Sequence, residues 1–271
     1  MSDPNVGFTE SIPPIYDEFL GPVFFEPYAV DLAGRLAGLR EGRVLELAAG
    51  TGILTRCLRD ALPSTVEIVA TDLNGAMLER AKPKFTTSER VAFSVADATK
   101  LPFADESFDA VACQFGIMFF PDKPASLREC LRVLRPGGSL LFNVWDSLEH
   151  NDLARIADDA VRAAFPADPP TFYHTPYGCF DVESISSMVA AAGFEAGEHA
   201  ALSLPGNSPS ALASAKGIVE GTPMSNEIRR RDPAAIAAIV AAVERELIAR
   251  FGGPDGAKMR AIVFAAKRPS H

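Results

Sequence analysis

The strongest constraint on the fold is a regular alternation of short apolar runs and helical segments between Arg43 and Trp145. Five runs are typical of buried strands: Arg43 to Leu47, Val66 to Thr71, Val91 to Val95, Phe108 to Cys113 and Ser139 to Trp145. Helical periodicity separates them at Ile53 to Leu62, Asn74 to Ala81 and Ser126 to Leu134. Parallel strands need helical crossovers of this kind. The sequence therefore predicts an α/β fold, a Rossmann-like, doubly wound and mostly parallel sheet with helices on both faces.

The remaining segments predict further helices and the last strands. Helices are expected at Phe24 to Leu39, Leu153 to Ala164, Val182 to Ala192 (with Asp181 as N-cap), Pro209 to Glu220 and Pro233 to Arg250, and strands at Glu195 to Leu204 and Ala257 to Ala266. Helices between the last two strands predict a helical cap. We accordingly divide the chain into N-terminal lid helices (1–40), a ligand-binding core (41–147), an insertion with remaining core elements (148–206), the helical cap (207–256) and a last strand (257–271).

Charge and composition favour a small-molecule partner over nucleic acid. The formal net charge is −9, whereas nucleic-acid binders usually carry a basic patch. The dense basic run at 229–231 is flanked by Glu227 and Asp232, which is typical of a solvated helix end. No apolar run is long enough to span a membrane, and Met1 to Pro14 lacks the pattern of a signal peptide. We therefore expect a cytoplasmic monomer or homodimer.

The cysteines and histidines predict no metal site. The four cysteines, Cys57, Cys113, Cys130 and Cys179, show no C-x-x-C spacing, and the four histidines are scattered. We expect the cysteines to be buried, reduced thiols.

The segment from Glu46 to Thr55 combines a strand end, a turn of small residues and a helix start. In the turn Ala48-Ala49-Gly50-Thr51-Gly52, the two glycines allow a ligand to approach the backbone closely. The pattern lacks the third glycine of a nicotinamide dinucleotide site, and Glu46 would repel a pyrophosphate. A carboxylate there suits a ligand that carries an ammonium group. The turn therefore predicts a site at the crevice where open α/β sheets bind ligands.

Two acidic residues at later strand ends fit the rest of a nucleoside. Asp72 follows a strand twenty positions after Gly52, where a carboxylate can accept both ribose hydroxyls. The alternative makes Asp72 a helix N-cap, although Asn74 can take that role instead. Asp97 can accept a hydrogen bond from an exocyclic amine, and the Ala98 N–H can donate to a ring nitrogen. Together they would recognise an adenine edge.

These elements, with Leu131 to Gly138, resemble in order and spacing the class I S-adenosylmethionine-dependent methyltransferases related to the ubiquinone and menaquinone biosynthetic enzymes. The resemblance covers about Arg43 to Trp145. It implies a seven-stranded sheet with an antiparallel last strand. It also implies S-adenosyl-L-methionine as cofactor and S-adenosyl-L-homocysteine as product.

The resemblance also assigns residues around that cofactor. Glu46 would hold the methionine end, Gly50 and Gly52 would line the cofactor, and Asp72 would bind the ribose. Leu73 and Met77 would flank the adenine, Asp97 and Ala98 would read its edge, and Gln114, followed by Phe115, would lie beside the methionine moiety. Ala48 stands where many members have glycine. The pair Tyr16-Asp17 resembles one that closes over the cofactor, so Tyr16 is a candidate for the methionine carboxylate or the substrate, or else an aromatic that packs a lid helix.

We expect transfer of a methyl group to a small, largely apolar metabolite. Aromatic and histidine side chains could line its pocket: Phe115, Phe119, Phe120, Tyr173, His174, Tyr177 and Phe180. His174 is a candidate general base, although a surface histidine is the commoner outcome. Phe119 and Phe120 are more typical of core residues than of pocket residues. A non-catalytic sensor or partner-binding module is the main rival function, and an NAD(P)-dependent oxidoreductase the weaker one.

A lid over the methyl group is the last expectation. The N-terminal helices, the Leu148 to Phe180 insertion and the helices between Ser208 and Arg250 lie outside the recognisable core and hold many of the aromatics. Expelling water would strengthen interactions at a charged sulfonium.

Overall fold

The computed structural model describes residue 7 and residues 12–205, 208–254 and 256–270. These residues form two compact units. The sheet unit consists of Tyr28–Trp145, Phe180–Leu202 and Ala261–His271. The helical unit consists of Met1–Pro27, Asp146–Cys179 and Ser203–Arg260. The start of the predicted lid (1–6 and 8–11) and the predicted limit at 206–207 lie outside the described residues.

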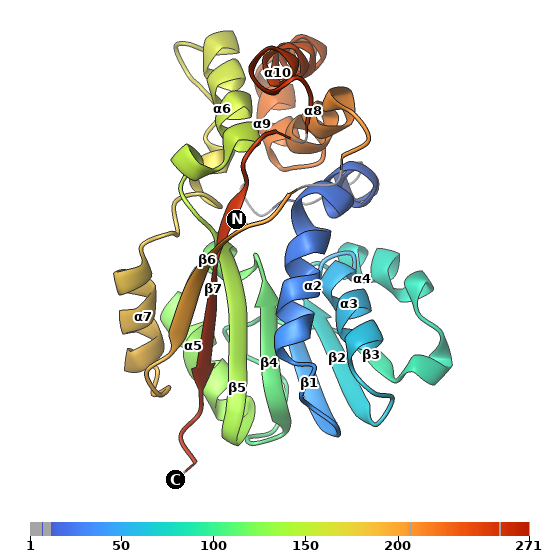
Figure 1. Cartoon of the computed structure of the whole chain (residues 1–271), viewed down its shortest axis with the longest axis vertical. Helices are drawn as coiled ribbons and strands as arrows, with labels where there is room; N and C mark the ends of the chain where they lie inside the picture. Colours follow the sequence, from blue (N-terminus) through green and yellow to red (C-terminus); the bar gives the residue numbers. More distant parts are fainter. Residues whose placement is uncertain (1–6, 8–11, 206–207, 255, 271) are drawn as a thin grey trace. The chain divides into compact units, whose positions relative to one another are not determined.

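One sheet of seven strands organises the chain (Figure 1). The strands are β1 (Gly42–Leu47), β2 (Val66–Asp72), β3 (Val91–Val95), β4 (Phe108–Gln114), β5 (Leu134–Trp145), β6 (Glu198–Ser203) and β7 (Arg260–Lys267). Their order is β3-β2-β1-β4-β5-β7-β6. Neighbours from β3 to β5 are parallel, and β7 is antiparallel to β5. The predicted doubly wound fold is confirmed, and its strand order reverses between β1 and β4, where such sheets bind ligands.

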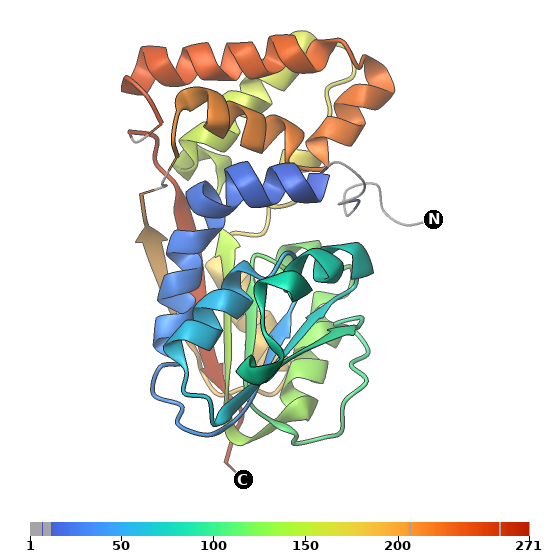
Figure 2. The same cartoon turned by 90° about the vertical axis from the view of Figure 1, so that its right-hand side faces the viewer.

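Helices cover both faces of this sheet (Figures 1 and 2). One face carries α2 (Glu26–Arg35), α3 (Ile53–Ala61) and α4 (Gly75–Ala81), and the other carries α5 (Lys123–Val133) and α7 (Val182–Ala191). Under α2 and α3 lies a core that includes Leu32, Leu58, Val44, Ile68 and Leu141. Burying each such side chain contributes about 1.5–3 kcal/mol, which is why the inner strands are apolar on both faces.

The helical unit packs its helices on one another (Figure 2). It contains α1 (Ile12–Ile15), the π-helix η2 (Tyr16–Phe25), α6 (Asp152–Ala164), α8 (Ala211–Glu220), α9 (Met224–Arg231) and α10 (Ala235–Phe251). Helix α8 contacts η2, α6 and α10. The contact with η2 is tight, because a Cβ on Gly217 would lie 3.1 Å from the Phe19 carbonyl oxygen.

Short 3₁₀ turns complete the two units: η3 (Lys82–Lys84), η4 (Thr87–Glu89), η5 (Ile117–Phe119), η6 (Leu148–His150) and η7 (Phe172–His174). No helix in the described part of the chain is long and apolar enough to cross a membrane. Within the same residues, no group of three or more His, Cys, Asp or Glu side chains could hold a metal ion.

Several expected boundaries were wrong. Helix α9 was missed because Met224–Arg231 is short and polar; the arginine run forms its last turn, as expected of a helix end. The segment expected as one helix from Phe24 to Leu39 begins in η2, and α2 ends at Arg35. Strand β5 starts at Leu134 rather than Ser139, because a pairing irregularity accommodates the proline and glycines. Strands β6 and β7 start three residues later than expected.

The expectation for the cysteines holds for two of the four. Cys113 and Cys130 are buried, but Cys57 and Cys179 are partly exposed. Burial raises the pKa of the Cys113 thiol to about 12. Cys113 is therefore a protonated core residue near neutral pH.

Candidate functional site

The turn after β1 adopts the backbone conformation that its small residues permit. Gly50 and Gly52 have φ values of 56° and 83°, and Ala48 has a φ of 52°. A Cβ on Gly52 would lie 3.0 Å from the Cβ of Ala81, so the turn also packs tightly on α4. Ala49 and Thr51 are buried. Gly52 is therefore required by both its left-handed backbone and its closeness to α4.

Asp72 links the ends of β1 and β2. Its Oδ2 accepts a hydrogen bond from the Gly50 N–H at 2.8 Å, and its Oδ1 accepts one from the Asn74 N–H at 2.7 Å. Asn74, not Asp72, caps α4, because its Oδ1 accepts the Ala76 N–H at 3.0 Å. Burial raises the pKa of Asp72, and the two N–H donors oppose that rise. Carboxylate oxygens can accept more than one hydrogen bond, so this geometry is compatible with a further hydroxyl partner.

Glu46 is a buried carboxyl group at the end of β1. Its side chain is 1% exposed, and Oε2 has no hydrogen-bond partner among the described residues. Burial, with a smaller contribution from Asp72, raises the pKa of Glu46 to about 8, against the lowering effect of Thr55. A carboxyl group in this setting would be mostly protonated at neutral pH, because none of the groups described around it is a cation that would favour the charged form.

The predicted adenine residues lie near the ends of β2 and β3. Asp97 is exposed in the loop after β3, and its Oδ1 accepts hydrogen bonds from the Thr99 N–H and hydroxyl at 2.8 and 2.7 Å. Ala98, which follows it, is partly buried. Leu73 is 65% exposed, whereas Met77 is buried, and its Cε would lie 3.5 Å from a Cβ on Gly50. An apolar side chain as exposed as Leu73 can cover a flat ring.

The turn after β4 is held by Asn143, a residue that sequence reasoning missed. Phe115 has a φ of 50°, and its N–H donates to Asn143 Oδ1 at 2.9 Å. Its ring stacks on Trp145 with centroids 3.9 Å apart, and Gln114 before it is partly buried. A polar residue inside the otherwise apolar run from Ser139 to Trp145 was the signal in the sequence.

Gly116 connects this turn to the turn after β1. A Cβ on Gly116 would lie 2.5 Å from the Ala48 Cβ and 2.8 Å from the Cys113 Sγ. Ala48 and Phe115, which flank this contact, both have left-handed backbone conformations that cost about 1–3 kcal/mol each. Such strain concentrates at functional sites. All the predicted cofactor residues except Tyr16 belong to the sheet unit, since they lie between Tyr28 and Trp145.

The remaining candidates lie in the helical unit. Tyr16 stacks on Phe25 with ring centroids 4.8 Å apart. Tyr173 is fully buried, and its hydroxyl donates to the Ile218 carbonyl at 2.8 Å, so it is a core residue. The exposed His174 bonds through Nε2 to Arg162 Nη2 at 2.7 Å. Since a guanidinium only donates, this contact occupies the Nε2 lone pair.

Phe119 and Phe120 are partly buried rather than full core residues.

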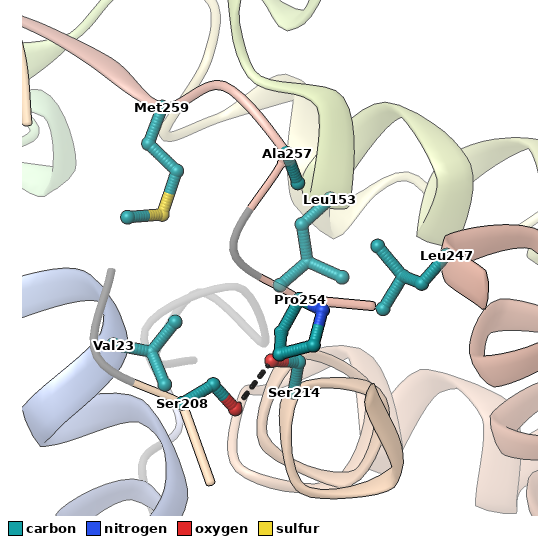
Figure 3. A pocket seen from close by; sticks show the side chains of 8 residues that line it. All are labelled: Val23, Leu153, Ser208, Ser214, Leu247, Pro254, Ala257 and Met259. Atoms are coloured by element: carbon teal, nitrogen blue, oxygen red, sulfur yellow. Dashed lines mark hydrogen bonds between the residues drawn. The ribbon is translucent and has the colours of Figure 1, made fainter. Parts of the chain in front are cut away.

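A small pocket in the helical unit is lined by none of the predicted aromatic residues. Its lining residues are Val23, Leu153, Ser208, Ser214, Leu247, Pro254, Ala257 and Met259 (Figure 3). The Ser214 hydroxyl donates to the Ser208 hydroxyl at 2.7 Å. The pocket has a volume of about 10 Å³, enough for about one water molecule. In this structure it is therefore too small to hold a methyl acceptor.

Residues 45–142 match the family described as methyltransferase domain. The chain is 34% identical over 174 residues to the ubiquinone/menaquinone biosynthesis C-methyltransferase UbiE of Pseudomonas aeruginosa, covering 59% of this chain and 68% of that one. UbiE of Pseudomonas savastanoi is 42% identical over 134 residues, covering 48% and 52%.

Solved structures share the fold at lower identity. The YcgJ protein from Bacillus subtilis has a TM-score of 0.59 at 22% identity and covers 90% of this chain and 100% of its own. The Haemonchus contortus phosphoethanolamine N-methyltransferase 2, solved with S-adenosyl-L-methionine, has a TM-score of 0.61 at 20% identity, covering 97% and 58%. The [4+2]-cyclase SpnF has a TM-score of 0.61 at 20% identity, covering 96% and 94%.

The sheet order, the glycine turn and the acidic residue at the end of β2 define the class I, Rossmann-like methyltransferase fold. The relationship in sequence then makes the assignment narrower. The chain belongs to the S-adenosylmethionine-dependent methyltransferase family that includes the UbiE enzymes.

Proposed function

We propose that this enzyme binds S-adenosyl-L-methionine in the sheet unit and methylates a small, largely apolar metabolite, releasing S-adenosyl-L-homocysteine. The observation that carries this proposal is the cluster of Glu46, the glycine turn and Asp72 at the reversal of strand order. Membership of a methyltransferase family supports it, and the nicotinamide alternative has no comparable support.

The residues of the sheet unit fit such a cofactor. The unpartnered Oε2 of Glu46 would accept a hydrogen bond from the ammonium group of the methionine moiety, which would favour the carboxylate form. Asp72 would accept ribose hydroxyls while it holds the Gly50 N–H. Asp97 and Ala98 would recognise the adenine edge, with Leu73 and Met77 beside the ring. Ala48, Ala49, Thr51, Gln114 and Phe115 would form the remaining walls.

The bound cofactor supplies an electrophilic methyl group on a sulfonium. The protein's contribution would be to align the acceptor with that methyl group and to exclude water. We retain Tyr16 as the candidate for the methionine carboxylate or the substrate. His174 would act as a general base only if its bond to Arg162 opened, so the proposal gives it no required proton transfer.

The decisive experiment combines binding with methyl transfer. Calorimetry should show that the protein binds S-adenosyl-L-homocysteine, and incubation with methyl-labelled cofactor and a panel of apolar metabolites should label at least one. Asp72→Ala is the control variant in which both binding and methyl transfer should weaken. Binding without transfer to any acceptor would favour a sensor or another reaction on this fold. Tight NADH binding without binding of the methyl donor would overturn the proposal.

A further inference from the structure

Asn143 is a buried polar residue in the middle of the sheet. Its side chain is fully buried in β5, in register with Gln114 of β4 and Val263 of β7. Two positions earlier on β5, Leu141 belongs to the apolar core under α2 and α3. Core packing alone would favour an apolar residue at position 143, because a buried amide must find hydrogen-bond partners.

The amide of Asn143 is only half satisfied. Oδ1 accepts the Phe115 N–H at 2.9 Å, and the main-chain oxygen of Asn143 accepts the same N–H at 3.2 Å. Nδ2 has no partner among the described residues. The residue therefore uses both of its oxygens on a single donor, the N–H at the turn after β4, and leaves its own donor unused.

The bonded residue, Phe115, has an unfavourable backbone. With a φ of 50° it occupies the left-handed region, where a bulky side chain is rare. Its ring stacks on Trp145 and meets the Tyr28 ring edge-on, with the ring centroids of Phe115 and Tyr28 5.6 Å apart. This conformation leads the chain into Gly116. Gly116 lies so close to Ala48, in the turn after β1, that it cannot carry a Cβ.

We propose that Asn143 is a positioning residue for the cofactor site. By holding the Phe115 N–H it keeps Phe115 left-handed, which keeps the turns after β1 and β4 in contact. Asn143 acts on the cofactor through Phe115 and Gly116, without touching it. The inference rests on the proposed function for its binding readout, but not for its conformational one.

The test first replaces the Asn143 side chain in the wild-type protein and then repeats the replacement where residue 115 is glycine. Asn143→Leu keeps the volume and removes the side-chain acceptor, so the Phe115 N–H is left with the longer main-chain contact alone and Phe115 should leave the left-handed region. Affinity for S-adenosyl-L-homocysteine should fall about five- to thirtyfold, the range expected from the bias against that conformation. Asn143→Asp keeps a side-chain oxygen that can accept the Phe115 N–H and should retain more of the affinity. Leu141→Val, a core change on the same strand face, should leave affinity within about twofold.

A double variant separates positioning from packing. Glycine adopts left-handed conformations readily, so in a Phe115→Gly background Asn143→Leu should weaken binding less than about threefold. An equal loss in both backgrounds would show a packing role and overturn the proposal, as would wild-type affinity in Asn143→Leu.

The ligand-free protein gives an independent readout. Trp145 is the single tryptophan of the chain and stacks on Phe115, so Asn143→Leu should shift its fluorescence while Leu141→Val should not. An unshifted spectrum would overturn the proposal even if the protein bound no nucleoside, whereas absent binding with a shifted spectrum would count only against the proposed function. If Asn143→Leu does not fold, the same comparisons use Asn143→Ala, which also lacks a side-chain acceptor.

Discussion

At the scale of single residues, Asp72 combines a structural role with a proposed binding role. Replacing it with alanine leaves the Gly50 and Asn74 N–H groups without their acceptor and would leave ribose hydroxyls poorly paired. We expect Asp72→Ala to lose about 1–3 kcal/mol of cofactor binding free energy. Calorimetry at fixed pH measures this. Asp72→Asn, which keeps one acceptor oxygen, should lose less, and unchanged affinity in Asp72→Ala would rule out the ribose assignment.

Glu46 makes cofactor binding depend on pH. Because its pKa in the free protein is about 8, binding of a cationic group below that pH first requires loss of a proton. Affinity for S-adenosyl-L-homocysteine should therefore rise as pH increases from 6 to 8, by up to about tenfold per unit, and then level off. Titration calorimetry in buffers of different ionisation enthalpy should detect the released proton.

The pH dependence of the free energy of unfolding provides a control for the role assigned to Glu46. The folded protein holds this proton more tightly than the unfolded chain does, since the pKa rises from 4.5 to about 8 on folding. The contribution of Glu46 therefore makes the free energy of unfolding fall as pH rises between these values. Glu46→Gln should remove that fall and flatten the pH dependence of binding. A flat profile in the wild-type protein would contradict the assignment.

At the scale of elements, the contact between α8 and η2 depends on glycine. A Cβ at position 217 would lie 3.1 Å from the Phe19 oxygen and 3.2 Å from Leu20 Cδ2. Gly217→Ala should lower the free energy of unfolding by about 1–3 kcal/mol, because backbone must move to admit it.

Gly34 provides the matched control for that prediction. It lies in α2, and a Cβ there would meet nothing within 4 Å. Gly34→Ala should therefore stabilise the protein, by about 0.5–1 kcal/mol. Urea denaturation of both variants measures the contrast. A Gly217→Ala protein as stable as the wild type would show that α8 and η2 can move apart at little cost in free energy.

Predictability from sequence differed between these elements. The inner strands and α3 to α5 were predicted because burial on both sheet faces and helical periodicity leave strong patterns. Helix α9 was missed because its packing, not its own pattern, makes it a helix. Asp72 was found because its chemistry recurs at a fixed spacing, whereas Asn143 acts through Phe115, 28 positions earlier, a distance that no local pattern records.

At the scale of the whole molecule, the helical unit is proposed to serve as a lid. Lids belong to the less stable parts of a fold. Within the predicted segment Met1 to Pro22, amide exchange should be fast in the free protein over the described residues 12–22, and it should also be fast over Pro166 to Cys179. Cofactor, or cofactor with substrate, should slow it, while the sheet stays protected. Equal exchange with and without ligand would make the cap a fixed wall and remove the roles proposed for Tyr16 and His174.

The path of the chain adds a constraint on how this enzyme can diversify. The backbone passes from one unit to the other five times, at Pro27/Tyr28, Trp145/Asp146, Cys179/Phe180, Leu202/Ser203 and Arg260/Ala261. No single cut or crossover in the gene can therefore separate the two units, and a recombinant inherits either unit whole only if several junctions move together. New specificity on this scaffold should thus arise by point substitution within the helical segments rather than by shuffling of intact modules.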